Sequence, residues 1–142
     1  MCIRDRKLEQ ILLNSKHLKD KQVYFIHGGI DSKERERIRH AMEKDDNIIL
    51  IASVGTTSTG TNIRNLHNII FASPSKSRIR NLQAAGRVLR LAENKTKAVL
   101  YDIADDFRYK KHTNYTMLHF YERLKTYDSE KFDYKIMNVE LK

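Results

Sequence analysis

The sequence predicts an α/β fold, built as a mostly parallel sheet with helices on both of its faces. Stretches with the period of a strand alternate with stretches with the period of an amphipathic helix along the chain. The run Ile48–Ala52 is apolar at every position, which is typical of a strand covered on both sides. Hydrophobic residues make up 40% of the 142 residues, enough for one domain with its own core although 32% are charged.

Four elements are expected in the first third of the chain. Leu8, Ile11, Leu12 and Ser15 recur at helical spacing, and Asp31 with Glu34 resembles a capping box at the start of a second helix. Glycines after a short apolar run permit a tight turn at a strand end. The expected elements are a helix over Lys7–Leu18, a strand over Val23–Ile26, a helix over Ser32–Lys44 and the strand Ile48–Ala52.

The remaining elements continue the same alternation. They are a strand over Asn68–Ala72 that ends before Pro74, a helix over Ser77–Ala92, a strand over Lys97–Ile103 and a helix over Asn114–Tyr127. Residues 1–6 are polar and lack a cap signal, so a non-native start or a fragment boundary is expected there. The domain is predicted to span residues 7–128, and residues 129–142 form a tail that either packs or frays.

Net charge and cysteine content narrow the class of protein. A net charge of +9 indicates a polyanionic partner, nucleic acid before membrane. Cys2 is the single cysteine, which excludes an internal disulfide and a cysteine-rich zinc site. No apolar run approaches the ~20 residues of a transmembrane helix. The expected location is the cytoplasm.

Two groups of charged residues are given ordinary structural roles. The charged side of the helix Ser32–Lys44 is expected to face solvent, and its cations include Lys33, Arg35, Arg37 and Arg39. Three acids at a strand end, Asp102, Asp105 and Asp106, could form a metal cluster. We instead expect them to cap the next segment or to pair with the cations Arg108, Lys110 and Lys111. No metal ligand is predicted.

The predicted helix Ser77–Ala92 separates an apolar face from a strongly basic one. At about 100° per residue, one side carries Arg80, Gln83, Arg87 and Arg90. Guanidinium groups crowded on one face repel one another, and they match phosphate oxygens in planar, bidentate geometry. On the apolar side, Gly86 would allow another backbone to approach closely. The plain alternative is a solvated basic face.

The segment Ser53–Asn62 follows a buried strand and is rich in hydroxyl residues and glycine. Its backbone N–H groups and hydroxyls suit phosphate oxygens, either of a nucleotide or of a nucleic-acid backbone. The alternative is a plain Ser/Thr/Gly loop. His27, at the end of the strand Val23–Ile26, is interpreted as a turn residue near nucleic acid rather than as a catalytic base.

These stretches together resemble the second RecA-like domain of superfamily-two helicases and translocases. Gln83-Ala84-Ala85-Gly86-Arg87-Val88-Leu89-Arg90 resembles motif VI, Ala52–Ile63 resembles motif V, and Val23–Gly29 resembles the segment after motif IV. The resemblance covers roughly Lys7–Tyr127. Two further patterns, around Ser58–His67 and Asn114–Tyr127, look like phage-type DNA repair and recombination helicases.

The resemblance implies a role for residues around the nucleotide. Arg87 and Arg90 would face the γ-phosphate of ATP, with Arg90 as the arginine finger. Gln83 would position water or phosphate. Gly60 and Asn62 would lie on the ATP side of the loop, although Asn62 stands where many relatives have Asp and carries no charge.

The same resemblance implies contacts with nucleic acid. Ser53, Thr56 and Thr57 would lie near the DNA backbone, and His27 with Gly28 would form the neighbouring turn. DNA and RNA helicases share all of these motifs, so the resemblance leaves RNA open.

Two motifs of a complete ATP site are missing from this sequence. It has neither a Gly-x-x-x-x-Gly-Lys-Ser/Thr loop nor an Asp-Glu-x-x stretch in a strand context. ATP and Mg²⁺ would therefore be held mainly by an N-terminal RecA-like domain of the same protein, and the present domain would start too late to include its first strand. The rival interpretation is a nucleic-acid-binding module without catalytic activity.

Overall fold

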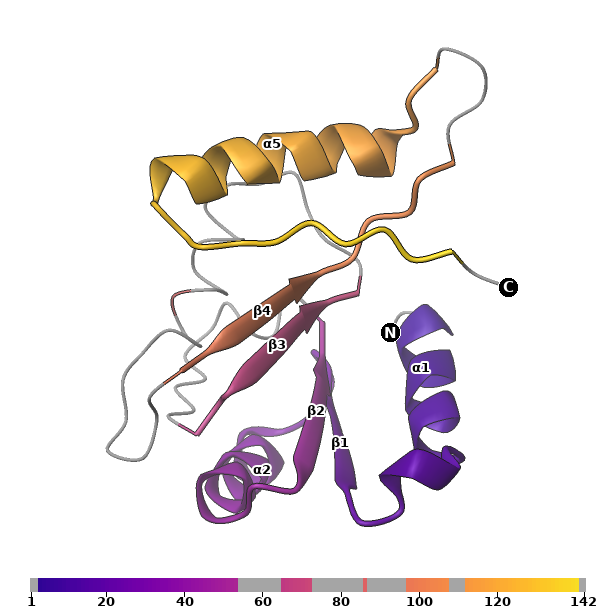
Figure 1. The fold of residues 1–142 in the computed structure, drawn as a ribbon. Coiled ribbons are helices and arrows are strands. Elements are labelled where there is room, and N and C mark those ends of the chain that lie inside the picture. Colours follow the sequence, from indigo (N-terminus) through magenta and orange to yellow (C-terminus); the bar gives the residue numbers. More distant parts are fainter. Residues whose placement is uncertain (1–2, 54–64, 73–85, 87–96, 108–111, 141–142) are drawn as a thin grey trace. The chain divides into compact units, whose positions relative to one another are not determined.

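A computed structural model of the protein describes residues 3–53, 65–72, 86, 97–107 and 112–140. The chain divides into two compact units, one of Met1–Ile69 with Gln83–Leu100 and one of Ile70–Leu82 with Tyr101–Lys142. Figure 1 labels the helices and strands of the described part.

Strands β1 (Gln22–Ile26) and β2 (Ile48–Ala52) form a parallel pair in the first unit. Their register runs from Gln22 opposite Ile48 to Ile26 opposite Ala52. Both strands lie where the apolar runs predict them, and the parallel pairing confirms the expected α/β class.

Helices cover both faces of this strand pair. Helix α2 (Ser32–Lys44) packs Ile38 and Met42 against Ile26, and the half-buried Tyr24 and Leu50 join this cluster. Because side chains alternate along a strand, the intervening residues of β1 and β2 face the opposite way. Helix α1 (Ile3–Leu13) packs against both strands, and Figure 1 shows α1 and α2 flanking them. The continuous apolar run in β2 is explained by this coverage.

Helix boundaries agree closely with the prediction at α2 and poorly at α1. The Asp31 carboxylate accepts a hydrogen bond from the Glu34 N–H (2.8 Å), so the expected N-cap of α2 is confirmed. The single helix predicted over Lys7–Leu18 is wrong. Helix α1 begins at Ile3 and ends at Leu13, and a separate 3₁₀ turn spans Lys16–Leu18. The polar pair Asn14-Ser15 interrupts the helix, as expected from side chains that compete for backbone hydrogen bonds.

Strands β3 (Asn68–Phe71) and β4 (Val99–Asp102) form a second pair, and the boundary between the two units falls within both. The N–H of Val99 donates to the His67 carbonyl (3.0 Å), and the N–H of Ile103 donates to the Phe71 carbonyl (3.3 Å). Both bonds advance in the same direction along the two strands, so this pair is parallel as well.

Helix α5 (Tyr115–Ser129) and the segment after it belong to the second unit. The helix was predicted over Asn114–Tyr127, and Asn114 is its N-cap residue. After the helix, the Phe132 N–H donates to the Tyr127 carbonyl (2.9 Å), and the two rings stack with their centroids 6.0 Å apart. The start of the tail therefore packs on the end of α5, whereas Met137 and Val139 are exposed.

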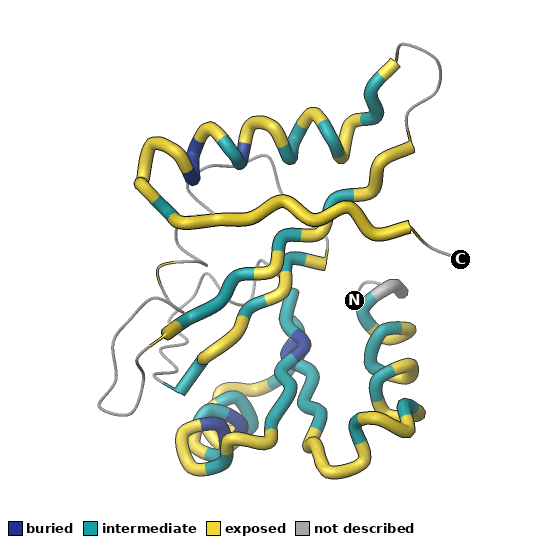
Figure 2. Tube along the Cα trace, in the orientation of Figure 1, coloured by how far each residue is buried: buried dark blue, intermediate teal, exposed yellow. Residues whose placement is uncertain are grey.

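The two units bury different kinds of side chain. Figure 2 shows the buried positions of the described part on β1, β2 and α2 in the first unit and on α5 in the second. Those of the first unit are apolar, whereas α5 buries Arg123, Thr126 and Tyr127. In the residues that the structure describes, no helix has the length and hydropathy needed to cross a membrane.

Candidate nucleotide and nucleic-acid interface

The carboxyl edge of the β1–β2 pair brings together two residues that the sequence assigns to a nucleic-acid contact. His27 directly follows Ile26, Ser53 directly follows Ala52, and Ile26 and Ala52 are partners in the register. Adjacent strands lie about 4.8 Å apart, so His27 and Ser53 leave the sheet side by side. Carboxyl edges of parallel strands are the usual place for ligand sites in α/β folds.

The turn after β1 is fixed by its own side chain. The Gly29 N–H donates to His27 Nδ1 (3.1 Å), and the Ile30 N–H donates to the His27 carbonyl (3.2 Å). An accepting Nδ1 leaves Nε2 to carry the proton of the neutral ring. A Cβ atom at Gly29 would lie 3.3 Å from two atoms of this ring, so a larger residue there would require the ring to shift by a few tenths of an ångström. At Gly28 a Cβ atom would meet no atom of the described residues within 4 Å.

Arg35 clamps this turn from the first part of α2. Its Nε donates to the Ile30 carbonyl (3.1 Å), and its Nη2 lies 3.5 Å from the carbonyl oxygen of His27 and 3.4 Å from that of Gly28. The expectation that Arg35 belongs to a solvated face is therefore wrong. A guanidinium has several donors in one plane, so the single side chain of Arg35 can contact three carbonyl groups of this turn.

The other two arginines of α2 pair with acids of the same helix. Arg37 pairs with Glu34 (2.7 Å), and Arg39 pairs with Glu36 and with Glu43, the latter at 2.6 Å. The hydrogen bond from Arg37 lowers the pKa of the Glu34 carboxyl. Arg37 is 64% exposed, so a solvated position is confirmed for it, whereas Arg39 is half-buried. An exposed pair such as Arg37–Glu34 contributes little to stability.

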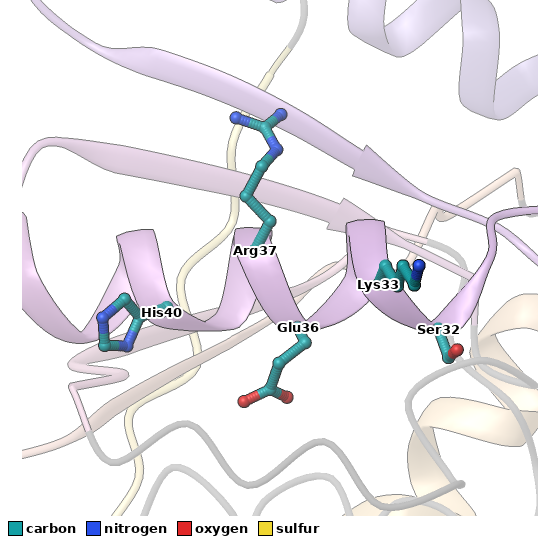
Figure 3. Close-up of a pocket in the computed structure, with 5 residues that line it drawn as sticks. All are labelled: Ser32, Lys33, Glu36, Arg37 and His40. Atoms are coloured by element: carbon teal, nitrogen blue, oxygen red, sulfur yellow. The ribbon is translucent and has the colours of Figure 1, made fainter.

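A shallow depression of about 520 Å³ lies on α2. Figure 3 shows side chains of mixed charge leaving the helix in different directions, with Glu36 and Arg37 pointing to opposite sides. The side chains that line it are Ser32, Lys33, Glu36, Arg37 and His40. None of them is a residue that the sequence assigns to ATP or to nucleic acid.

Asn65 is the first residue of the described segment 65–72, and its side chain makes three polar contacts. The Asn65 amide donates to the Met42 carbonyl (3.3 Å) and to the Asp46 carboxylate (2.7 Å). Its Oδ1 lies 3.0 Å from Nε2 of His67. These contacts tie Asn65 to the end of α2 and to the entry of β3.

A buried ionic cluster joins β4 to α5 in the second unit. Arg123 donates through Nε and Nη2 to the two carboxylate oxygens of Asp102, at 2.7 and 2.8 Å, and the Tyr127 hydroxyl donates to the same carboxylate (2.8 Å). The Arg123 side chain is only 1% exposed and that of Asp102 9%. Burial, together with the charge of Asp102, raises the pKa of Tyr127.

The sequence interpretation missed this cluster. Asp102 was expected to cap the next segment or to pair with Arg108, Lys110 or Lys111, and its partner is Arg123 instead. The available signal was the spacing of Arg123 and Tyr127, which lie four residues apart and therefore on one side of a helix. In the part of the chain that the structure describes, no three His, Cys, Asp or Glu side chains are placed to hold a metal ion.

The remaining predicted site residues lie outside the described residues. They are Thr56, Thr57, Gly60, Asn62, Gln83, Arg87 and Arg90. Gly86 is described, and it is helical and exposed, as a helix over this stretch requires. A Cβ atom added there would meet nothing within 4 Å in the described ranges, so the expected close approach of another backbone is not observed among them.

Comparison with known proteins identifies the family. The pattern of the helicase conserved C-terminal domain matches residues 1–92. The chain belongs to this family. The fold of this helicase C-terminal domain is similar to the crystal structure of the C-terminal part of the Fun30 ATPase domain, with a TM-score of 0.56 at 19% identity, over 86% of this chain and 44% of that one. The predicted RecA-like fold is thereby confirmed.

Viral helicases are among its relatives. The ATP-dependent DNA helicase uvsW of Enterobacteria phage T4 is 35% identical over 84% of this chain. The putative helicase 22 of Sulfolobus islandicus filamentous virus (isolate Iceland/Hveragerdi) is 32% identical over 42% of it. The chain spans only 26% of the first relative and 11% of the second. The expected resemblance to a phage helicase is confirmed at the level of the family.

Proposed function

We propose that this chain is the C-terminal RecA-like domain of an ATP-dependent DNA helicase and supplies one half of an ATP site that lies between two domains. The observation that carries the proposal is the carboxyl edge of β1 and β2. In a chain of the helicase family, this edge holds His27 beside Ser53, at the start of the hydroxyl-rich loop. The name of the phage T4 relative supports DNA as the nucleic acid and ATP as the nucleotide.

In this proposal the basic helix acts on the nucleotide. Arg87 and Arg90 reach the γ-phosphate, with Arg90 as the finger that offsets the charge developing there in the transition state. Gln83 positions water or phosphate, and Gly60 and Asn62 line the nucleotide side of the loop. The N-terminal RecA-like domain of the same protein holds most of the ATP and the Mg²⁺.

The hydroxyl-rich loop and the turn after β1 act on the DNA. Ser53, Thr56 and Thr57 contact the phosphate backbone, and His27 with Gly28 forms the adjacent wall. Arg35 holds the carbonyls of this turn and thereby fixes where its amides point. Closure of the domains on ATP and their opening after hydrolysis would move the loop along a strand. The protein acts in the cytoplasm of a bacterial or phage-infected cell.

The experiment that tests this proposal is DNA-stimulated ATP hydrolysis by the intact protein. Removal of an arginine finger costs about 10³-fold or more in kcat, so we expect Arg90→Ala to lose turnover far more than nucleotide affinity. Arg37→Ala is the matched control, because it removes the same charge from the exposed face of α2.

Each alternative has its own outcome. An unchanged kcat in Arg90→Ala contradicts the finger role. If the wild type also fails to hydrolyse ATP but binds DNA with a steep salt dependence, the chain belongs to a binding module without catalytic activity.

A further inference from the structure

Several aromatic side chains are exposed around the start of α5. The exposed fraction of Phe107 is 73% and that of Tyr115 is 80%. Tyr121 is 42% exposed, but it lies six residues further along the helix and therefore on a different side of it. Single exposed apolar residues are common on protein surfaces, but gathered aromatic rings usually mark a binding surface. Neither motif V nor motif VI includes these residues.

Hydrogen bonds hold Phe107 and Tyr115 on one local framework. The Phe107 N–H donates to Oδ1 of Asn114 (3.3 Å), and Nδ2 of Asn114 donates to the Asp105 carbonyl (2.7 Å). The Thr116 hydroxyl donates to the same carbonyl (2.7 Å). The segment that carries Phe107 is thus tied to the first turn of α5, which carries Tyr115, so the backbone that presents these two rings is held in place before any ligand binds.

The charge of the surrounding sequence indicates an anionic occupant. Residues 107–125 contain five Lys or Arg residues and five aromatic residues, but Glu122 is their single acid. Arg123 is buried in its pair with Asp102, whereas Lys125 pairs with Glu122 but is 72% exposed. Interleaved cations and aromatic rings are typical of surfaces that bind single-stranded nucleic acid, because the cations attract phosphates while bases stack on the rings.

We propose that Phe107 and Tyr115 form a stacking surface for the bases of single-stranded DNA. This surface would add base contacts to the backbone contacts of the hydroxyl-rich loop. The inference rests on the proposed DNA partner but is independent of the ATP site.

The test compares two ligands that share their phosphates. The 142-residue chain is titrated into a fluorescent oligo(dT) of about 20 nucleotides, longer than typical single-strand sites, and into an abasic oligomer of the same length. Stacking on aromatic rings predicts tighter binding of oligo(dT). In Phe107→Leu/Tyr115→Leu, which keeps apolar side chains but removes both rings, we expect about a tenfold loss for oligo(dT) and no change for the abasic oligomer.

Two controls separate stacking from other effects. Tyr115→Phe keeps a ring and should bind oligo(dT) as the wild type does. Thermal unfolding of each variant should be close to that of the wild type, because both substituted side chains are exposed. Phe107→Leu alone provides a second variant if the double substitution perturbs the fold.

The contradicting results differ in what they overturn. If oligo(dT) and the abasic oligomer bind equally and the leucine variant changes neither, the stacking surface is wrong but the phosphate contacts of the proposed function stand. If neither oligomer binds, both the stacking surface and the DNA partner are wrong. A loss of ATP hydrolysis in Arg90→Ala is independent of either result.

Discussion

The two units of this chain are stabilised by opposite means. In the first, Ile26, Ile38 and Met42 form a small apolar core between a parallel strand pair and a helix. In the second, the most buried side chain of the described part is Arg123, which pairs with Asp102. Shortening one apolar side chain of a core removes part of its packing energy. Removing one partner of a buried ion pair leaves the other charge buried without a counter-charge.

The two units also differ in how well their stabilising interactions can be predicted from the sequence. Amphipathic periodicity records an apolar core directly, because every buried position must be hydrophobic. A buried ion pair places charged residues at positions where a periodicity analysis expects apolar ones. The analysis therefore assigns these charged residues to the exposed face. The presence of the ion pair between β4 and α5 fits a role in fixing one helix orientation, since a bidentate arginine–carboxylate pair is strongly directional.

The largest expected effect is from Asp102→Asn. This substitution keeps the shape of the side chain but leaves the buried Arg123 without its counter-charge, which should lower the free energy of unfolding by about 3–5 kcal/mol. Urea denaturation measures the loss. Hydrogen exchange should locate it, with faster exchange of the amides of α5 than in the wild type and little change in those of α2.

Glu122→Gln is the matched control for that substitution. Glu122 pairs with Lys125 at 2.8 Å, but both side chains are largely exposed, so we expect a change below about 1 kcal/mol. Equal effects of the two substitutions would show that burial does not decide the strength of the Asp102 pair.

A smaller effect is expected from Tyr127→Phe, and it should depend on pH. Loss of the hydrogen bond to Asp102 should cost about 1 kcal/mol near neutral pH. The folded state raises the pKa of Tyr127, chiefly through burial, above the value of about 10 of an unfolded tyrosine. The stability that this shift provides is complete below pH 10 or so and is lost as the pH rises further.

Urea denaturation at neutral pH and in the alkaline range above about pH 10 tests whether the free energy of unfolding falls with rising pH, as the raised pKa of Tyr127 predicts. Wild-type stability should fall more steeply with rising pH than that of Tyr127→Phe, with Tyr115→Phe as a control that removes an exposed hydroxyl. Identical slopes for the wild type and Tyr127→Phe would contradict the assignment of the alkaline loss to this hydroxyl.

Most of the fold could be predicted from the sequence because it rests on local patterns. The strand β2 and the helix α2 have the predicted bounds, and the cap at Asp31 was visible as a capping box. The error at α1 has a local cause, since polar Asn14 and Ser15 interrupt a pattern whose apolar spacing continues. Periodicity reports which face is apolar and does not report whether the backbone stays helical.

The site was predictable only where position along a strand decides the geometry. His27 and Ser53 come together because each follows a strand end, and parallel strands place those ends at one edge. Arg35 and Arg37 look alike in the sequence, yet one clamps a turn and the other pairs with Glu34. That difference depends on where the turn after β1 lies in space, and no pattern within α2 encodes it.

The measurement that tests the central claim most directly is ATP hydrolysis by the 142-residue chain alone, with DNA and Mg²⁺ present. In our proposal the chain contributes arginines to an ATP site, and its sequence contains no phosphate-binding loop of the Gly-x-x-x-x-Gly-Lys-Ser/Thr type. We therefore expect no turnover above background, and turnover that depends on Arg90 in the protein that includes the N-terminal RecA-like domain. DNA-stimulated hydrolysis by the chain alone would contradict the proposal that it holds only half of the site.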